Sequence, residues 1–372
     1  MNILKIKISP IIPILILTFI FQNIFAQGIE HYSILLPYHN LTTGIGQTLG
    51  GASVAMPDSI PVIFNNPANL AQLRHPTGFI SLNYSEGTID PVDDTNGYFD
   101  SYYFEKNLSV GLAALSLPLT IKHLPVTLAA SYNSTMPYSL KLGDLYRGSE
   151  TSHSASLGLA VQLAGRFRLG MGGTYRYGKY DTKTVENIGG YFLTNRSVQY
   201  WGNIFHIGLQ NDIAQRFALG VVYYFPAPME MKVKTYYSYV SGEYSYKEKS
   251  QIPGALRFGL GYRFSAKGTL GVGYGYQWFK GSHSSLSSFS AGIEYKFRLN
   301  NIIFPLYVMY ENRSVPSYVG EFMRFSSQEK ATSHILGVGG GLQWQSYTLY
   351  FSTQWSGCSS YQVDMLPAPP FS

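Results

Sequence analysis

Large apolar residues and small or polar residues alternate along much of the chain with a period of two. Between 167 and 177, one face carries Phe167, Leu169, Met171, Tyr175 and Tyr177, and the other carries Arg168, Gly170, Gly172, Thr174 and Arg176. Successive side chains of a β-strand point to opposite faces, so this pattern predicts a strand with two unlike faces.

Thirteen segments show this alternation, and each is predicted to be a strand. They cover 77–89, 99–118, 124–137, 150–165, 166–183, 197–213, 216–227, 252–264, 268–281, 285–299, 301–313, 331–345 and 346–357. Because bacterial single-chain barrels have an even number of strands, about 14 are expected. The remaining strand is expected in 229–240, 317–325 or 359–365.

The small, polar face of these segments favours a membrane barrel over a soluble sheet sandwich, whose outer face would be charged. Composition agrees, with 38 Gly, 31 Tyr and 22 Phe but only 13% charged residues, against about a quarter in soluble domains. No stretch after residue 26 is apolar for the roughly 18 residues that a spanning helix needs. We therefore predict an all-β fold, a transmembrane antiparallel β-barrel, because a closed barrel satisfies every backbone hydrogen bond.

Connections between the strands should differ at the two ends of such a barrel. Short turns are expected at the periplasmic end and long polar loops outside the cell. The polar stretches predicted to be loops are 90–96, 141–152, 181–197, 236–250 and 314–330. Aromatic residues near strand ends are expected to form girdles at the membrane interfaces.

The N-terminus has the pattern of a secretory signal peptide. Lys5 and Lys7 precede an apolar run that two prolines interrupt, and cleavage is expected after Ala26. Removing these two lysines leaves 25 basic and 21 acidic residues, a net charge of +4. The excess forms no basic run, so no nucleic-acid partner is expected. Cys358 is the single cysteine, which excludes an internal disulfide.

Residues 27–75 lack sustained alternation and are dense in Gly, Ala and turn residues. Asn66 followed by Pro67 reads as the cap and first position of a short helix over 68–73. We predict three parts: a signal peptide (1–26), a plug (27–75), and a barrel with a short C-terminal tail (76–372).

The stretch from Gly46 through Gly50 and Gly51 to Asn66, Pro67 and Ala68 resembles the FadL family of outer-membrane transporters for long-chain fatty acids and other hydrophobic compounds. The resemblance implies a bacterial outer-membrane protein whose N-terminal hatch lies inside the barrel and moves to open a path. Gly50, Gly51, Asn66, Pro67 and Ala68 would belong to that hatch. Its partners would be a hydrophobic small molecule and outer-membrane lipid, with no cofactor. The chain departs from the family at its end, MLPAPPFS, where three prolines exclude a regular strand.

Leu115, Leu117 and Phe279 fall on inner faces in this register and are candidates for the ligand pathway. Charged residues on inner faces favour mutual pairing that braces the lumen or hatch over the charged ring of a diffusive porin. They are Arg168, Arg176, Arg257, Arg263, Glu294, Lys296 and Arg298.

A second interpretation is a scaffold. The hatch-and-barrel pattern also resembles barrel components of type IX secretion, of the PorV and PorQ kind, which hold cargo at the cell surface. A secreted protein would then be the partner.

Catalysis is the least favoured class. His153 beside Ser154, and His283 beside Ser284 and Ser285, are the only suggestive neighbours. Adjacent residues of a strand point to opposite faces, so neither His meets its neighbouring Ser. No carboxylate pair or Cys and His cluster stands out in the sequence, so we expect neither an enzyme nor a metal site.

Overall fold

The computed structural model describes residues 53–55, 65–89, 102–142, 146–163, 165–187, 191–237, 242–278, 285–300, 302–319, 324–344 and 347–359. The predicted signal peptide, Gly50, Gly51 and Phe279 lie outside these residues. Most of the candidate strand at 359–365 also lies outside them.

The described residues form fifteen strand segments and one short 3₁₀ helix, η3 (Pro67–Gln72). The strands are β1 (Thr77–Ile89), β2 (Tyr102–Ile121), β3 (Leu124–Leu142), β4 (Tyr146–Gln162), β5 (Phe167–Asn187), β6 (Tyr191–Asn211), β7 (Phe217–Tyr224), β8 (Ala227–Tyr237), β9 (Gly242–Ile252), β10 (Gly254–Arg263), β11 (Gly268–Trp278), β12 (Ser285–Leu299), β13 (Ile302–Val319), β14 (Arg324–Trp344) and β15 (Tyr347–Ser359). All thirteen predicted strands are confirmed.

The strands form one antiparallel sheet in the order β1 to β7, then β10 to β15. β8 continues β7 after Phe225 and Pro226, and β9 leads into β10 across Pro253. The described strands therefore make thirteen passes. Of the three places considered for a further strand, 229–240 lies mostly in β8, the continuation of β7, and 317–325 lies at the far ends of β13 and β14.

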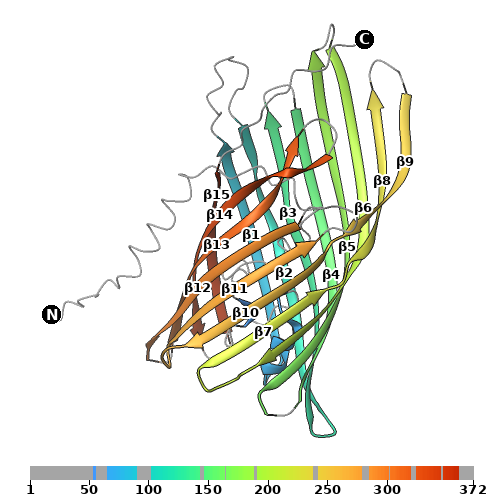
Figure 1. Ribbon diagram of the computed structural model, residues 1–372. Coiled ribbons are helices and arrows are strands. Elements are labelled where there is room, and N and C mark those ends of the chain that lie inside the picture. The colour runs from blue at the N-terminus through green and yellow to red at the C-terminus, as the bar shows by residue number, and fades with distance from the viewer. Residues whose placement is uncertain are drawn as a thin grey trace, which may run out of the picture.

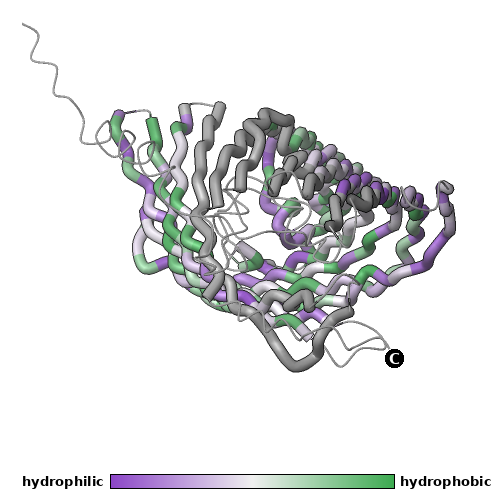
Figure 2. Tube along the Cα trace, turned by 90° about the horizontal axis from the view of Figure 1, so that it is seen from above, coloured by the Kyte–Doolittle hydropathy of each residue, from purple (hydrophilic) through white to green (hydrophobic). Residues whose placement is uncertain are grey.

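The sheet curls around a central space and makes a barrel (Figures 1 and 2). Inner-face side chains are buried and outer-face side chains are more exposed. Along β7, every second residue from Ala218 to Tyr224 is buried, and the residues between them are not. Outer-face apolar residues include Leu157, Met171, Phe205, Phe258 and Phe289, which are 42% to 70% exposed. Such a face suits lipid, and the ten residue steps from Phe167 to Tyr177 in a strand tilted by roughly 40° span about 25 Å, the height of a barrel's apolar band.

Aromatic pairs lie at both borders of this band. Phe217 packs on Tyr262 near the short turns, with ring centroids 4.8 Å apart. Toward the other end, Trp278 packs with Tyr223 at 5.9 Å and with Tyr276 at 6.2 Å. These positions are those of interfacial girdles.

Tight turns gather at one end of the barrel. Lys122 and His123 join β2 to β3 with φ of 47° and 71°, the conformation of a two-residue hairpin turn whose twist matches the strands. The opposite end differs from the sequence prediction, because 146–152, 181–187, 191–197 and 242–250 are strand and not loop. These segments contain four Tyr and four Thr, residue types that favour strands even where both faces are polar.

The predicted inner-face positions of Leu115 and Leu117 are wrong. They are 62% and 44% exposed, whereas Ser116 between them is 7% exposed. The cause is a bulge in β2, where Ser81 pairs with Leu112 and Leu82 pairs with Val110. The extra residue shifts the alternation by one, so both leucines point outward.

None of the helices in the described ranges is long and apolar enough to cross a membrane.

Candidate functional site in the barrel lumen

A plug made of residues 53–55 and 65–73 fills the lumen near the short turns. Within it, η3 contacts β3, β4, β5 and β6. Ala68 and Leu70 are fully buried, and Leu70 packs with Ala71, Ala129 and Ala160. The helix predicted after Asn66 is therefore present, as a 3₁₀ turn inside the barrel.

Asn66 holds the plug together and attaches it to the wall. Its Oδ1 accepts a hydrogen bond from the Ala68 backbone N–H at 3.1 Å, which is the predicted cap. Its Nδ2 donates to the Val54 carbonyl at 2.9 Å and to the Leu209 carbonyl of β6 at 3.1 Å. Because Asn66 is fully buried, losing these bonds would leave polar groups unsatisfied.

Four inner-face glycines form the seat of the plug. They are Gly170 on β5, Gly208 on β6, Gly220 on β7 and Gly259 on β10. A Cβ at Gly170 would come within 2.7 Å of the Pro67 carbonyl oxygen, and one at Gly220 within 2.7 Å of the Val54 carbonyl carbon. Only glycine allows such a close backbone approach. Gly170 pairs directly with Gly208, and Gly220 with Gly259, so the seat consists of two glycine pairs on neighbouring strands.

Polar side chains tie the plug to the wall at the same level. Gln210 of β6 accepts from Gln72 at 3.1 Å and donates to the Ala55 carbonyl at 3.4 Å. Below it, Arg168 forms an ion pair with Asp212. Lys296 lies 3.5 Å from Glu294 in the lumen wall. These contacts match the predicted bracing role of the inner-face charges.

An apolar cluster lies in the lumen beside the plug. Val54 of the plug reaches it, and its wall residues come from β2, β6, β7, β8, β9 and β10. Tyr200, Ile204, Val222 and Tyr224 are each at most 1% exposed. The other members are Leu112, Ala227, Met229, Ile252 and Ala255.

A buried arginine borders this cluster. The Arg176 guanidinium lies 5.6 Å from the centroid of the Tyr200 ring, and its Nε donates to Ser152 Oγ at 3.0 Å. Arg176 is 3% exposed, and its Nη1 and Nη2 have no hydrogen-bond partner among the described residues. The guanidinium therefore presents two donor nitrogens without a partner among the described residues beside an apolar surface.

The pairing between neighbouring strands is interrupted next to the apolar cluster. β7 and β10 pair as far as Tyr224 and Ala255, and β8 and β9 resume with Ala227 and Ile252. Between them, two neighbouring strands each carry a proline, which cannot donate to the ladder. Trp278 pairs with Gly254, and within the described residues β9 pairs only with β8.

The candidate catalytic neighbours do not form a site. His153 is exposed and lies 2.7 Å from the Tyr132 hydroxyl, whereas Ser154 is buried on the other face. His283 and Ser284 lie outside the described residues. In the part of the chain that the structure describes, no group of three or more His, Cys, Asp or Glu side chains is placed to hold a metal ion.

Sequence reasoning found Asn66, Pro67 and Ala68, which the structure brings together in the buried plug. It did not single out the seat glycines or the apolar cluster. The signal for the seat was the row of small residues at inner-face positions of adjacent strands. The apolar cluster has no such signal, because its members come from six strands and their meeting depends on register.

These features define a class of protein, a transmembrane β-barrel whose lumen holds a plug formed by the same chain. Solved structures share this fold. They include a TodX mutant monoaromatic hydrocarbon channel (TM-score 0.57, 12% identity, 85% of this chain and 97% of that one). A Pseudomonas aeruginosa FadL homologue has a TM-score of 0.56 and 13% sequence identity, over 84% of this chain and 87% of that one. The Ralstonia pickettii toluene transporter TbuX has a TM-score of 0.53 and 11% identity, over 84% of this chain and 96% of that one.

The sequence profile of the BamG family matches residues 12–323, so the chain belongs to the BamG family. A comparison with curated protein sequences gave no match.

Proposed function

We propose that this protein is a passive outer-membrane transporter for hydrophobic small molecules, gated by its plug. The observation that carries the proposal is the buried apolar cluster, which lies between the plug and a break in the strand pairing of the wall. An apolar molecule needs such a surface inside an otherwise polar lumen. The fold shared with hydrocarbon channels and a FadL homologue supports the same function.

In this proposal the plug closes the path. Val54 belongs both to the plug and to the apolar cluster, so moving the plug would expose the cluster to the lumen. The seat permits this motion, because the attachment consists of a few side-chain hydrogen bonds and backbone contacts with glycines. Asn66, Pro67 and Ala68 would then be the moving part of the hatch.

Arg176 favours a ligand with an anionic head, such as a long-chain fatty acid. A carboxylate is the partner that two guanidinium donors bind most strongly, and the neighbouring cluster would take the acyl chain. We expect Arg176→Met to reduce the uptake of fatty acids into proteoliposomes but not that of a neutral aromatic hydrocarbon. Arg216→Met, which removes an exposed arginine near the short turns, is the control. Equal loss of both substrates would argue against a carboxylate site.

A disulfide between plug and wall tests the gate. A Cβ at position 259 would lie 3.0 Å from the Ala55 Cβ, so a small shift gives the separation of about 3.5–4.5 Å found in disulfides. Ala55→Cys and Gly259→Cys, in a chain with Cys358→Ser, should abolish transport when oxidised and restore it when reduced. Ala55→Cys alone should be insensitive to reductant. Undiminished transport by the oxidised pair would overturn plug gating.

A scaffold is the second candidate function, and β9 favours it because, among the strands that the structure describes, it pairs only with β8. An unpaired edge strand offers backbone groups to a strand of another protein. The locked variant separates the two functions. A scaffold would keep its cellular role with the plug locked, whereas a transporter would lose it.

A further inference from the structure

A row of basic side chains crosses the outer face of the wall beyond the aromatic border. In register, Lys179 of β5 lies beside Gln199 of β6, Gln199 beside Lys232 of β8, and Lys232 beside Lys247 of β9. Lys179 has the same parity along β5 as exposed Tyr175 and Tyr177, so the row faces outward.

The adjacent row on the membrane side begins with two aromatic residues. Tyr177 of β5 pairs with Trp201 of β6. Trp201 pairs with Glu230 of β8, and Glu230 pairs with Lys249 of β9. Aromatic rings mark the height at which lipid headgroups begin. The lysines therefore stand where the charged part of a lipid would be found.

The pair Lys232 and Lys247 is unusual. Cross-strand partners on one face have Cβ atoms about 5 Å apart, and like charges in this position destabilise a sheet. Neighbouring lysines have carboxylate partners, Lys179 with Asp181 at 2.7 Å and Lys234 with Glu243 at 2.6 Å. Lys232 and Lys247 form no ion pair within the described ranges. Their repulsion is relieved if an anion lies between them.

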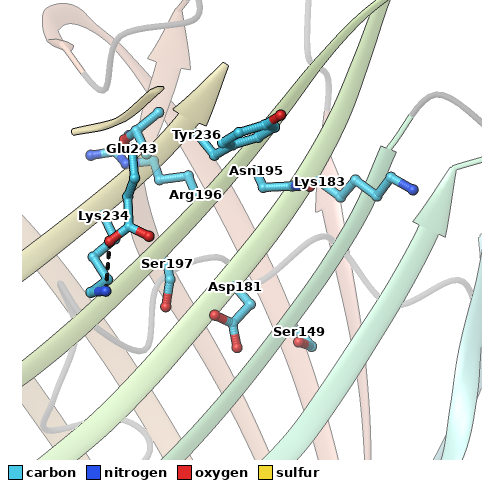
Figure 3. A pocket seen from close by; sticks show the side chains of 10 residues that line it. Ser149, Asp181, Lys183, Asn195, Arg196, Ser197, Lys234, Tyr236 and Glu243 are labelled. Atoms are coloured by element: carbon cyan, nitrogen blue, oxygen red, sulfur yellow. Dashed lines mark hydrogen bonds and ion pairs between the residues drawn. The ribbon is translucent and has the colours of Figure 1, made fainter. Parts of the chain in front are cut away.

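A hollow of about 470 Å³ lies beside Lys234, which is two residues along β8 from Lys232. Figure 3 shows Ser149, Asp181, Ser197 and Lys234 in a line across the strands, with Lys234 bonded to Glu243. The hollow is also lined by Lys183, Asn195, Arg196, Thr235 and Tyr236. Hydroxyl and amide groups of this kind bind sugar hydroxyls, and lysines bind phosphate.

We propose that this lysine face, defined as Lys179, Lys232, Lys234, Lys247 and Lys249, binds the phosphorylated headgroup of a glycolipid in the surrounding membrane leaflet. Charge complementarity and the continuity of the face with the lipid-facing band identify the occupant as a lipid. The hydroxyl and amide side chains that line the hollow identify it as one with a sugar headgroup. Each lysine near an anionic membrane surface adds to the attraction.

The test measures the midpoint of thermal unfolding of the full-length protein in detergent during titration with rough-type lipopolysaccharide. The test variant is Lys232→Gln with Lys247→Gln. The control is Lys122→Gln with Lys267→Gln, which removes two exposed lysines from the short turns at the other end. The test variant should need about 30-fold more glycolipid for the same stabilisation, which corresponds to about 2 kcal/mol. The control should titrate like the wild type.

Two further arms separate this site from a general charge effect. Without lipid, the test variant should unfold at or above the wild-type temperature, because a like-charge contact has been removed. Dephosphorylated glycolipid and inorganic phosphate should stabilise neither protein. The proposal is overturned if the test variant titrates like the wild type, or if inorganic phosphate stabilises the wild type as well as the glycolipid does.

Discussion

Glycines on the inner face of the barrel meet two different kinds of neighbour. At Gly208 and the other three seat glycines, an added Cβ would meet the plug. Further along β5, at Gly172 and Gly178, it would meet the rings of His206 and Tyr200, which are the cross-strand partners of these glycines.

The two sets differ in what a larger side chain would displace. At the seat, the obstructing atoms belong mainly to the plug backbone and its cap, so the plug must move as a unit. At Gly172 and Gly178, the obstructing atoms belong to side chains of the same sheet. The seat glycines therefore control an association between two segments, and the other glycines control how the wall fills its own lumen.

The largest effect on plug seating is expected from Gly208→Val. The new side chain would overlap Asn66 and approach the Pro67 Cδ within 2.8 Å, so the seated plug becomes less favourable by about 3 kcal/mol. The open fraction should rise about 100-fold, which single-channel conductance in planar bilayers measures. The barrel itself should still form, as shown by heat-modifiable migration in gels. A variant as closed as the wild type would mean that the glycine is not part of the seat.

A smaller increase in the open fraction is expected for Asn66→Ala. This change removes the cap and two bonds to buried carbonyls, worth about 2 kcal/mol together. Conductance should show the open state about 30-fold more often than in the wild type. Asn66→Asp sharpens the result, because it keeps the acceptor for Ala68 but loses the donor to Val54 and Leu209. Its effect should fall between those of the wild type and Asn66→Ala.

Gly178→Ala should affect the wall alone. Its Cβ would come within 2.7 Å of Tyr200 Cε1, and repacking the ring should lower the free energy of unfolding by about 1–2 kcal/mol. Urea unfolding in lipid vesicles measures this loss, and the closed-state conductance should stay at the wild-type level. Increased opening in this variant would erase the distinction between the two sets.

Gly173→Ala provides the baseline for all three variants. Gly173 lies on the outer face of β5, where a Cβ would meet only the Phe205 ring at 3.3 Å. We expect changes within about 0.5 kcal/mol in stability and none in conductance.

The sequence predicted the barrel well because its main signal is local. Period-two alternation located every pass that the structure describes, and Asn66 with Pro67 located the start of η3. It failed at Leu115 and Leu117, where one bulge in β2 reverses the faces. It also assigned 236–250 to a loop, although most of that stretch belongs to β8 and β9.

The sequence by itself determined the class of fold, since an outer face of large apolar residues and an inner face of small ones suits a sheet curled in lipid. Tertiary structure decided which inner glycines lie under the plug, how Arg176 meets Tyr200, and that Lys232 faces Lys247. The reason is register. Each of these contacts joins residues on different strands or segments, and a shift of one residue in pairing would turn the side chains to opposite faces of the wall.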